Sequence, residues 1–350
     1  MAKLNEGDVI EGIFSIAIAQ LFAYGRIDKS KLNALRTRID PSMFSTGRFT
    51  TTVREYSDGI PEDKIRVKLT VRLKPSSVSE AFGSNYELLY KKSADVGNIN
   101  QKIDQLVSQT NTNYSRRIET IKNNFLKNNQ SDTVDIDIVA DGIAGESSGG
   151  AIKGDIDVKV MINGKESMDD RLSFSLKSGS KTLANLSPFN GMMDVVSRFG
   201  ITLKDRKKYE ELLGKTLASA KTSAEKRMKV ELIEQLYGEI KNGLKRKSGT
   251  PQFSNAAYQL FKDSAFGSDL AEVVDVNKTK IKEMNVETIN KMQNSREKVT
   301  FNDTGMKFLV KNQVLFQMRF KKRAEEIGAN DYAIKELKFY IEAGPAAYAK

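Results

Sequence analysis

Alternating apolar and polar residues mark two strands within residues 153–180, which read KGDIDVKVMINGKESMDDRLSFSLKSGS. Every second residue from 156 to 162 is Ile or Val, and Leu and Phe alternate with Ser and Lys from 172 to 177. Because successive side chains of a strand point to opposite faces, each run buries one face of a sheet. Asn163-Gly164 and the polar residues after it favour a hairpin between the two strands.

Similar patterns predict strands and helices on either side of this hairpin. An apolar block from Ile13 to Tyr24, ended by Gly25, predicts a helix buried between other elements. Residues 48–75 predict a strand pair, and a further strand is expected at 134–138, ahead of a Gly/Ser-rich loop. Helical spacing of apolar residues covers 76–130 and 203–294, and alternation returns at 312–323 and 334–344.

These elements together predict a mixed α/β protein in three parts. Residues 1–200 form the main core, 201–298 form a basic helical subdomain, and 299–350 supply strands that complete the core sheet. The helical subdomain is therefore interpreted as an insertion, since strands follow it. The helix predicted to come after the second strand of the hairpin lies within 181–200.

Composition narrows the chemistry that the chain can perform. Its 350 residues include no Cys and no His, which excludes disulfides, zinc–thiolate sites and histidine-based triads. Hydrolysis must then rest on carboxylates, Lys, Ser or Tyr. A net charge of +11 and a pI near 9.4 favour nucleic acid or an anionic surface as the partner.

The apolar block at Ile13–Tyr24 is too short to span a bilayer and has no basic leader, so we expect a cytoplasmic protein without a membrane partner.

The predicted hairpin brings Asp155 or Asp157 beside Ser175 and Lys177. Carboxylate oxygens are the ligands that Mg²⁺ prefers, and Mg²⁺ takes only one or two of them. A neighbouring ammonium can orient the attacking water and offset charge that develops on a phosphate. The alternative is a solvated strand face, on which Asp and Lys are ordinary.

An Asp at the head of one strand, a hairpin, and a second strand ending in Ser175-Leu176-Lys177 resemble the active-site signature of the PD-(D/E)XK nuclease superfamily. The surrounding SFSLKSGS is similar to a form found in some restriction-type endonucleases. The resemblance implies a restriction-endonuclease-like αβββαβ core, here with a helical insertion. It also implies a metal-dependent DNA endonuclease of restriction or phage type that uses Mg²⁺ or Mn²⁺. The chain departs from the pattern at Ser175, which stands where the second carboxylate is usual.

The resemblance also assigns roles to individual residues. Asp157 or Asp155 holds the metal, with Asp157 preferred because it lies deeper in the strand, and the carbonyl of Leu176 is an additional ligand. Lys177 positions or activates the water. Glu11, on the helix that precedes the sheet, either assists at the metal or complements the helix dipole. Ser178, Ser180 and Lys181 follow the strand and are expected to approach phosphates.

Clustered cations near the end of the long helical region predict contacts with the DNA backbone, because neutralising phosphates releases counterions. These cations are Lys241, Lys245, Arg246 and Lys247. Ser175 favours an alternative function, a nucleic-acid-binding or virion-associated protein whose nuclease fold has lost catalysis. A third hypothesis is a structural protein without a nucleic-acid partner. Sequence specificity, strandedness of the substrate, and a homodimer are left open.

Overall fold

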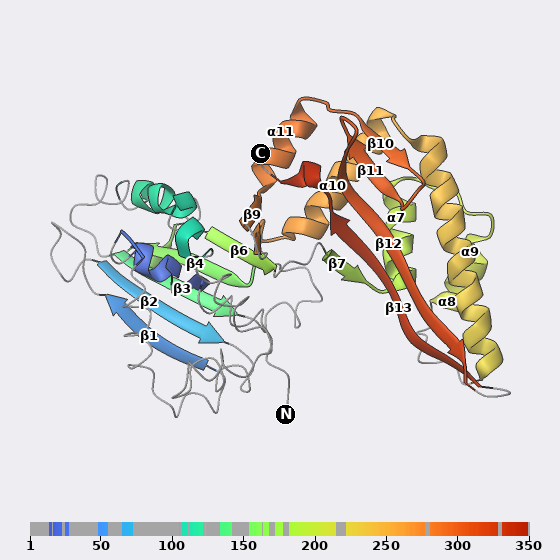
Figure 1. The fold of residues 1–350 in the computed structure, drawn as a ribbon, viewed down its shortest axis with the longest axis horizontal. Coiled ribbons are helices and arrows are strands. Elements are labelled where there is room, and N and C mark those ends of the chain that lie inside the picture. Colours follow the sequence, from blue (N-terminus) through green and yellow to red (C-terminus); the bar gives the residue numbers. More distant parts are fainter. Residues whose placement is uncertain are drawn as a thin grey trace. The chain divides into compact units, whose positions relative to one another are not determined.

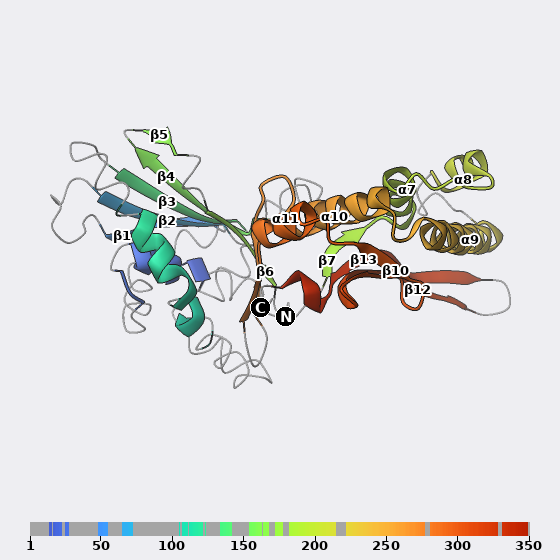
Figure 2. The same ribbon diagram turned by 90° about the horizontal axis from the view of Figure 1, so that it is seen from above.

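The computed structural model describes the polypeptide in segments that include the central strands and most of the C-terminal half. The described residues are 14–15, 17–22, 25–27, 48–54, 65–72, 105, 107–110, 112–121, 123, 134–141, 154–162, 164–167, 172–177, 182–214, 222–276, 281–327 and 331–348. The chain divides into two compact units, Met1–Ser180 with Phe266–Glu283, and Lys181–Ala265 with Met284–Lys350. Each unit contains its own β-sheet (Figures 1 and 2).

The sheet of the first unit is mixed and has eight strands. Its order is β1-β2-β3-β4-β6-β8-β9, with the short β5 paired to β4. The pairs β1–β2, β3–β4 and β4–β6 are antiparallel, whereas β2–β3 and β6–β8 are parallel. The bounds are β1 Arg48–Arg54, β2 Ile65–Arg72, β3 Val134–Asp141, β4 Ile156–Ile162, β5 Lys165–Glu166, β6 Leu172–Lys177, β8 Glu272–Val276 and β9 Ile281–Met284.

Two helical segments cover one face of this sheet. Described residues in 14–22 are helical and buried, as the apolar block at Ile13–Tyr24 predicts. The helical residues within 105–123 bury one side, including Tyr114 and Ile118. Phe14 and Tyr114 each meet the Phe174 ring edge-on, with ring centroids 5.1 and 5.2 Å apart respectively. This aromatic contact fixes the face of β6 that carries Leu172, Phe174 and Leu176, and leaves Ser173, Ser175 and Lys177 on the other face.

The second unit contains a five-stranded antiparallel sheet in the order β10-β11-β12-β13-β7. Helices α7, α9 and α10 lie on one face of it (Figure 2). The strand bounds are β7 Thr182–Leu186, β10 Val299–Asn302, β11 Lys307–Val310, β12 Gln313–Glu326 and β13 Tyr332–Ala343. The helix bounds are α7 Pro188–Arg198, α8 Arg206–Leu213, α9 Ser223–Lys247, α10 Pro251–Phe266 and α11 Val286–Asn294, followed by a 3₁₀ turn at Pro345–Ala347.

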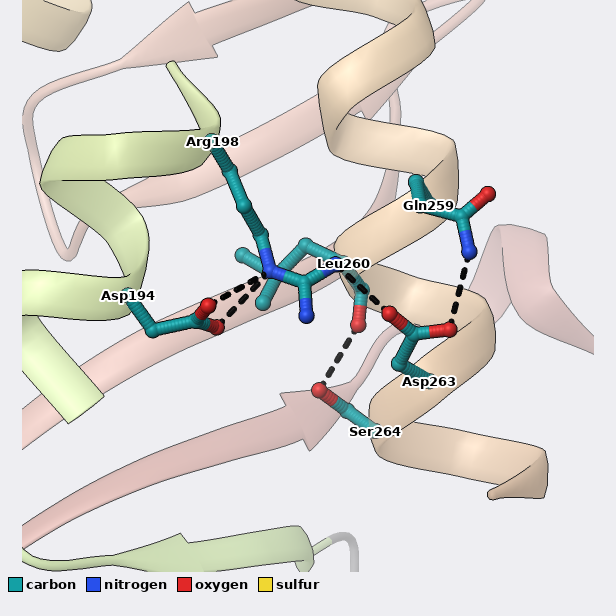
Figure 3. Close-up of polar contacts among 6 residues, drawn as sticks. All are labelled: Asp194, Arg198, Gln259, Leu260, Asp263 and Ser264. Carbon is teal, nitrogen blue, oxygen red and sulfur yellow. Dashed lines mark hydrogen bonds and ion pairs between the residues drawn. The ribbon is translucent and has the colours of Figure 1, made fainter. Parts of the chain in front are cut away.

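A stacked pair of aromatic rings, a helix cap and an ion pair between two helices stabilise the second unit. Phe308 stacks on Phe316 with ring centroids 4.1 Å apart, and both are fully buried. A capping box begins α9, in which Thr222 and Glu225 satisfy each other's backbone N–H groups. Arg198 of α7 joins Asp194 of the same helix to Asp263 of α10, where its nitrogens lie 2.8 and 2.6 Å from the two carboxylates (Figure 3). These carboxylates raise the pKa of Arg198 against the opposing effect of burial.

The fold confirms the mixed α/β class, the predicted strands at 48–75 and 134–138, and the antiparallel pairing of β4 with β6. Other parts of the predicted organisation are wrong. The C-terminal strands do not complete the first sheet, because β12 pairs with β13, and β13 with β7, in a second sheet. Residues 201–298 are not wholly helical, since β8 and β9 interrupt the helices and join the first sheet.

The segment after Lys177 also differs from its prediction. Residues 182–186 form β7, and a helix begins only at Pro188. Proline is favourable in the first turn of a helix because its missing N–H has no partner there. None of the helices among the described residues is long and apolar enough to cross a membrane.

Candidate functional site

Asp155 is the residue that connects the two strands of the predicted motif. It lies immediately before β4, and its backbone N–H donates to the Phe174 carbonyl of β6 over 2.7 Å. Its carboxylate turns to the same strand and accepts the Leu176 N–H, also over 2.7 Å. The Asp carboxylate is therefore held against the Ser-Leu-Lys segment by β4–β6 pairing together with a side-chain hydrogen bond.

Burial makes this carboxylate harder to ionise. Loss of solvent raises the pKa of Asp155, while the charge of Lys177 and the hydrogen bond from Leu176 oppose that rise. The Ser175 hydroxyl also lowers the pKa of Asp155, although the two groups form no hydrogen bond of ordinary geometry. Asp269 adds a second negative charge nearby and raises the pKa further. The net result is a pKa of Asp155 above the ordinary Asp value.

The structure places Asp157 differently from Asp155. In the β4–β6 register Asp157 is opposite Ser173, two residues before Ser175. The geometry thus favours Asp155 as the partner of Lys177, although the depth of Asp157 in the strand favoured the reverse. β4 begins at Ile156, so that Asp155 lies where the chain turns into the strand and its side chain reaches the backbone of β6; the metal role of Asp157 stays a prediction.

Asp269 is a residue that the sequence patterns do not single out. It precedes β8, and its carboxylate accepts the Gly154 N–H over 2.6 Å and lies 3.4 Å from the Ser173 hydroxyl. A side chain at Gly154 has no room, since an added Cβ would lie 2.1 Å from the Ser173 oxygen. Gly154 and Asp269 therefore position the turn that presents Asp155.

Asp275 is a second residue missed from the sequence. It lies in β8, which runs parallel to β6, and its register partner is Lys177. Only 6% of its surface is exposed. The sequence EVVDV contains three Val and two acidic residues without strict alternation, so its pattern does not mark a strand.

Several predicted site residues lie outside the described part of the chain. These are Glu11, Ser178, Ser180 and Lys181. Their proposed roles at the metal and at phosphates remain predictions. Among the described residues, no three Asp or Glu side chains gather closely enough to hold a metal ion together. A Mg²⁺ site here would depend on one or two carboxylates, which is the usual number for that ion.

The predicted basic cluster lies in the last turns of α9. Lys245, Arg246 and Lys247 are exposed, and Lys241 is half-buried one turn earlier. Lys245 pairs with Asp303 at 3.4 Å, whereas Arg246 and Lys247 form no ion pair with a described residue. Lys298, in the turn before β10, lies next to Gly249, which follows α9 by two residues. A Cβ added at Gly249 would be 2.7 Å from the Cε atom of Lys298. The cluster can neutralise phosphates without first breaking an ion pair at Arg246 or Lys247.

Comparisons of the chain with protein-family models, with curated proteins and with solved structures found no match.

Proposed function

We propose that the protein is a metal-dependent nuclease that hydrolyses phosphodiester bonds in DNA. The observation that carries the proposal is the half-buried Asp155 carboxylate, held on the Leu176 N–H and facing Lys177. A carboxylate and an ammonium fixed on neighbouring strands are the groups that the Asp…Ser-Leu-Lys signature requires. The closeness of Asp155 to this segment supports the proposal.

The strand arrangement supports the same proposal. Helical residues within 105–123, then β3, β4 and β6, and later β8 follow the strand order of the nucleases that the motif resembles, while the helices between β6 and β8 belong to the second unit. Successive antiparallel pairing of β3, β4 and β6 with parallel addition of β8 sets Asp155 and Lys177 at the middle of the sheet. β7 and the helices α7 to α10 between β6 and β8 belong to the second unit, together with β10 to β13.

The residues fit a divalent cation on the chemistry of their donors. Asp155 offers carboxylate oxygens, and burial raises its pKa although Lys177 and the Leu176 N–H favour the charged form. Bound Mg²⁺ or Mn²⁺ would polarise the phosphoryl oxygens and stabilise the leaving oxygen. The protein's own contribution is to orient: Lys177 holds the attacking water and offsets charge on the phosphate, and Asp155 fixes the ion's place beside Leu176.

The test is cleavage of supercoiled and linear duplex DNA with Mg²⁺ or Mn²⁺. Wild type is compared with Asp155→Asn and Lys177→Met, and binding of each to DNA is measured in Ca²⁺. We expect cutting that EDTA abolishes, a loss of at least about 100-fold in each variant, and unchanged DNA binding. Cutting that persists in both variants contradicts the assignment of the site.

One observation favours a second function, a DNA-binding protein whose nuclease fold is inactive. Ser175 is fully buried where a second carboxylate is usual. The same experiment separates the two functions. Salt-sensitive DNA binding without cleavage in any metal supports the binding protein, and absence of binding at low salt excludes both.

A further inference from the structure

The five-stranded sheet of the second unit has one face that points away from α9. Phe320 of β12 and Phe339 of β13 contact Tyr237 of α9, with ring centroids 5.4 and 6.5 Å from that of Tyr237. Lys322 also reaches α9, where its ammonium lies 2.7 Å from the Glu234 carboxylate. Because successive side chains of a strand point to opposite faces, the residues that alternate with these point away from the helices (Figure 2). We call this side of the sheet the outer face, and its β12 residues include Arg319, Lys321 and Arg323.

Positive charge dominates the outer face. Among the described residues, the strand register places five cations there against two carboxylates, Glu336 and Glu342, which leaves an excess of three positive charges. Past the bulge that follows Arg323, Lys335 pairs with Glu325 and leaves this balance unchanged. The five cations are Lys307, Arg319, Lys321, Arg323 and Lys338.

The register sets two of these cations opposite each other. Lys321 and Lys338 are direct cross-strand partners, and like charges in that arrangement are destabilising unless they are compensated. Glu336 compensates them in part, since its carboxylate lies 2.8 Å from the Lys321 ammonium and 3.6 Å from that of Lys338. One carboxylate therefore serves two cations, and net positive charge remains.

Exposure separates the cations of the outer face from its carboxylates. The side chains of Arg319, Lys321 and Lys338 are 62, 51 and 46% exposed, whereas those of Glu336 and Glu342 are 15 and 14% exposed. The carboxylates thus lie beneath the cations with which they pair. The layer that a partner would meet first is positive.

The cations of β12 form a row that suits a polymer of regularly spaced anions. Arg319, Lys321 and Arg323 alternate along the strand, so that a cation recurs about every 6.8 Å. Arg323 is exposed and forms no ion pair with a described residue, so it can meet a phosphate without first breaking one. Gln317 and Asn185 lie on the same face, and amide side chains also donate to phosphate oxygens.

Two other anionic partners fit this face less well. Proteins that bind single strands stack bases on aromatic side chains. The aromatic residue of the outer face in the described strands is Tyr340, which is half-buried and donates its hydroxyl to Glu336 over 3.1 Å. A membrane surface is usually bound with apolar side chains as well as cations, and none of the described strands of this sheet contains a large exposed apolar residue. A duplex, with its continuous rows of phosphates, fits best.

We propose that the outer face is a docking surface for duplex DNA, on which Arg319, Lys321 and Arg323 follow the phosphate backbone and Lys338 lies beside this row. The choice of DNA rests on the proposed function, whose substrate this surface would bind. The outer face is distinct from the cationic cluster of α9, because that helix packs on the opposite face of the sheet.

The test measures DNA binding by the whole chain in EDTA, so that cleavage does not interfere. Fluorescence anisotropy of a labelled duplex gives the slope of log K against log salt. Lys321→Gln and Lys322→Gln form a matched pair, because these neighbours in β12 carry equal charge, each pairs with a carboxylate, and they point to opposite faces. We expect Lys321→Gln to lower the slope by about 0.9 and Lys322→Gln to leave it unchanged. Arg319→Gln, Lys321→Gln and Arg323→Gln combined should lower the slope by up to about 2.7.

Circular dichroism verifies that each variant folds, and Lys321→Arg, which keeps the charge, should retain the wild-type slope. Equal slopes for Lys321→Gln and Lys322→Gln overturn the outer face as the DNA surface. A triple variant that binds the duplex as wild type does, but loses binding to single-stranded DNA or to phosphatidylserine vesicles, overturns duplex DNA as the partner.

A separate assay of plasmid cleavage by wild type in Mn²⁺ distinguishes this proposal from the nuclease. Lowered slopes without cleavage support the outer face and overturn the nuclease. Cleavage with unaltered slopes supports the nuclease and overturns the outer face.

Discussion

At the scale of single residues, the proposed chemistry depends on one buried carboxylate, Asp155. Asp155 accepts the Leu176 N–H and faces Lys177, yet burial raises its pKa more than these partners lower it. A group that the fold stabilises poorly in its charged form is typical of a functional site, where a ligand provides the missing interaction. Its neighbour Asp157, opposite Ser173, occupies an ordinary position in the strand register.

The raised pKa of Asp155 predicts how the stability of the metal-free protein depends on pH. Because its pKa is raised on folding, the folded state binds more protons than the unfolded state between the two pKa values. Its contribution to stability is fully present below the ordinary Asp pKa and is lost as the pH rises through the raised value. Asp155→Asn should therefore unfold at a higher temperature than wild type at mildly alkaline pH in EDTA, and at a similar temperature at acid pH. A variant that is less stable than wild type throughout this range would contradict the assignment.

At the scale of elements, the packing around α9 decides which of its glycines can be replaced by a residue with a side chain. α9 contains two glycines that differ only in their surroundings. A Cβ added at Gly243 would lie 2.5 Å from Ile201 Cγ2, whereas one added at Gly238 meets nothing within 4 Å. Ile201 is 6% exposed and has little space into which it can move. Gly243 is thus required by the contact between α9 and the segment after α7, and Gly238 is not.

The two glycines predict opposite effects on the free energy of unfolding. Gly238→Ala should stabilise the protein by up to about 1 kcal/mol, because Ala has the higher helix propensity. Gly243→Ala should destabilise it by about 1–3 kcal/mol, because the buried methyl group overpacks the contact with Ile201. Urea unfolding of both variants measures the difference. The account of α9 packing fails if Gly243→Ala is as stable as Gly238→Ala.

Much of the element order could be predicted from sequence, and the reasons for the failures are physical. β4 and β6 were predictable because period-two alternation is local, and so was the buried helix at Ile13–Tyr24. Which strands share a sheet is decided by contacts far apart in the chain. β12 and β13 alternate clearly, yet nothing local shows that the second neighbour of β13 is the five-residue β7. β8 lacks alternation altogether, so that Asp275 could not be placed beside Lys177 before the register was known.

At the scale of the whole molecule, excess positive charge is the property that bears on DNA. The chain carries a net charge of +11, and α9 ends in Lys245, Arg246 and Lys247. A matched group exists in α8, where Arg206, Lys207 and Lys208 are exposed and two of them pair with Glu210 and Glu211. Each group contains three cations, but only the α9 group contains two cations that form no ion pair with a described residue.

These two groups predict different salt dependence of DNA binding. Replacing all three α9 cations by Gln should lower the slope of log K against log salt by up to about 2.7, at about 0.9 per phosphate contact. The equivalent change in α8 should alter the slope much less, although both variants lose three positive charges. Fluorescence anisotropy of labelled duplex over a range of salt gives both slopes. Equal slopes would mean that net charge, and not the α9 cluster, governs binding.

The central claim is tested most directly by comparing two lysines on the same face of the first sheet. Lys177 ends β6 beside Asp155, whereas Lys159 is paired with Asp137 in the β3–β4 register, about 13 Å further along β4 than Asp155. Lys177→Met and Lys159→Met are assayed for Mn²⁺-dependent cleavage of plasmid DNA under single-turnover conditions. We predict that Lys177→Met loses cleavage while Lys159→Met cuts as wild type does. Equal rates for the two variants would contradict a nuclease site built on Asp155 and Lys177.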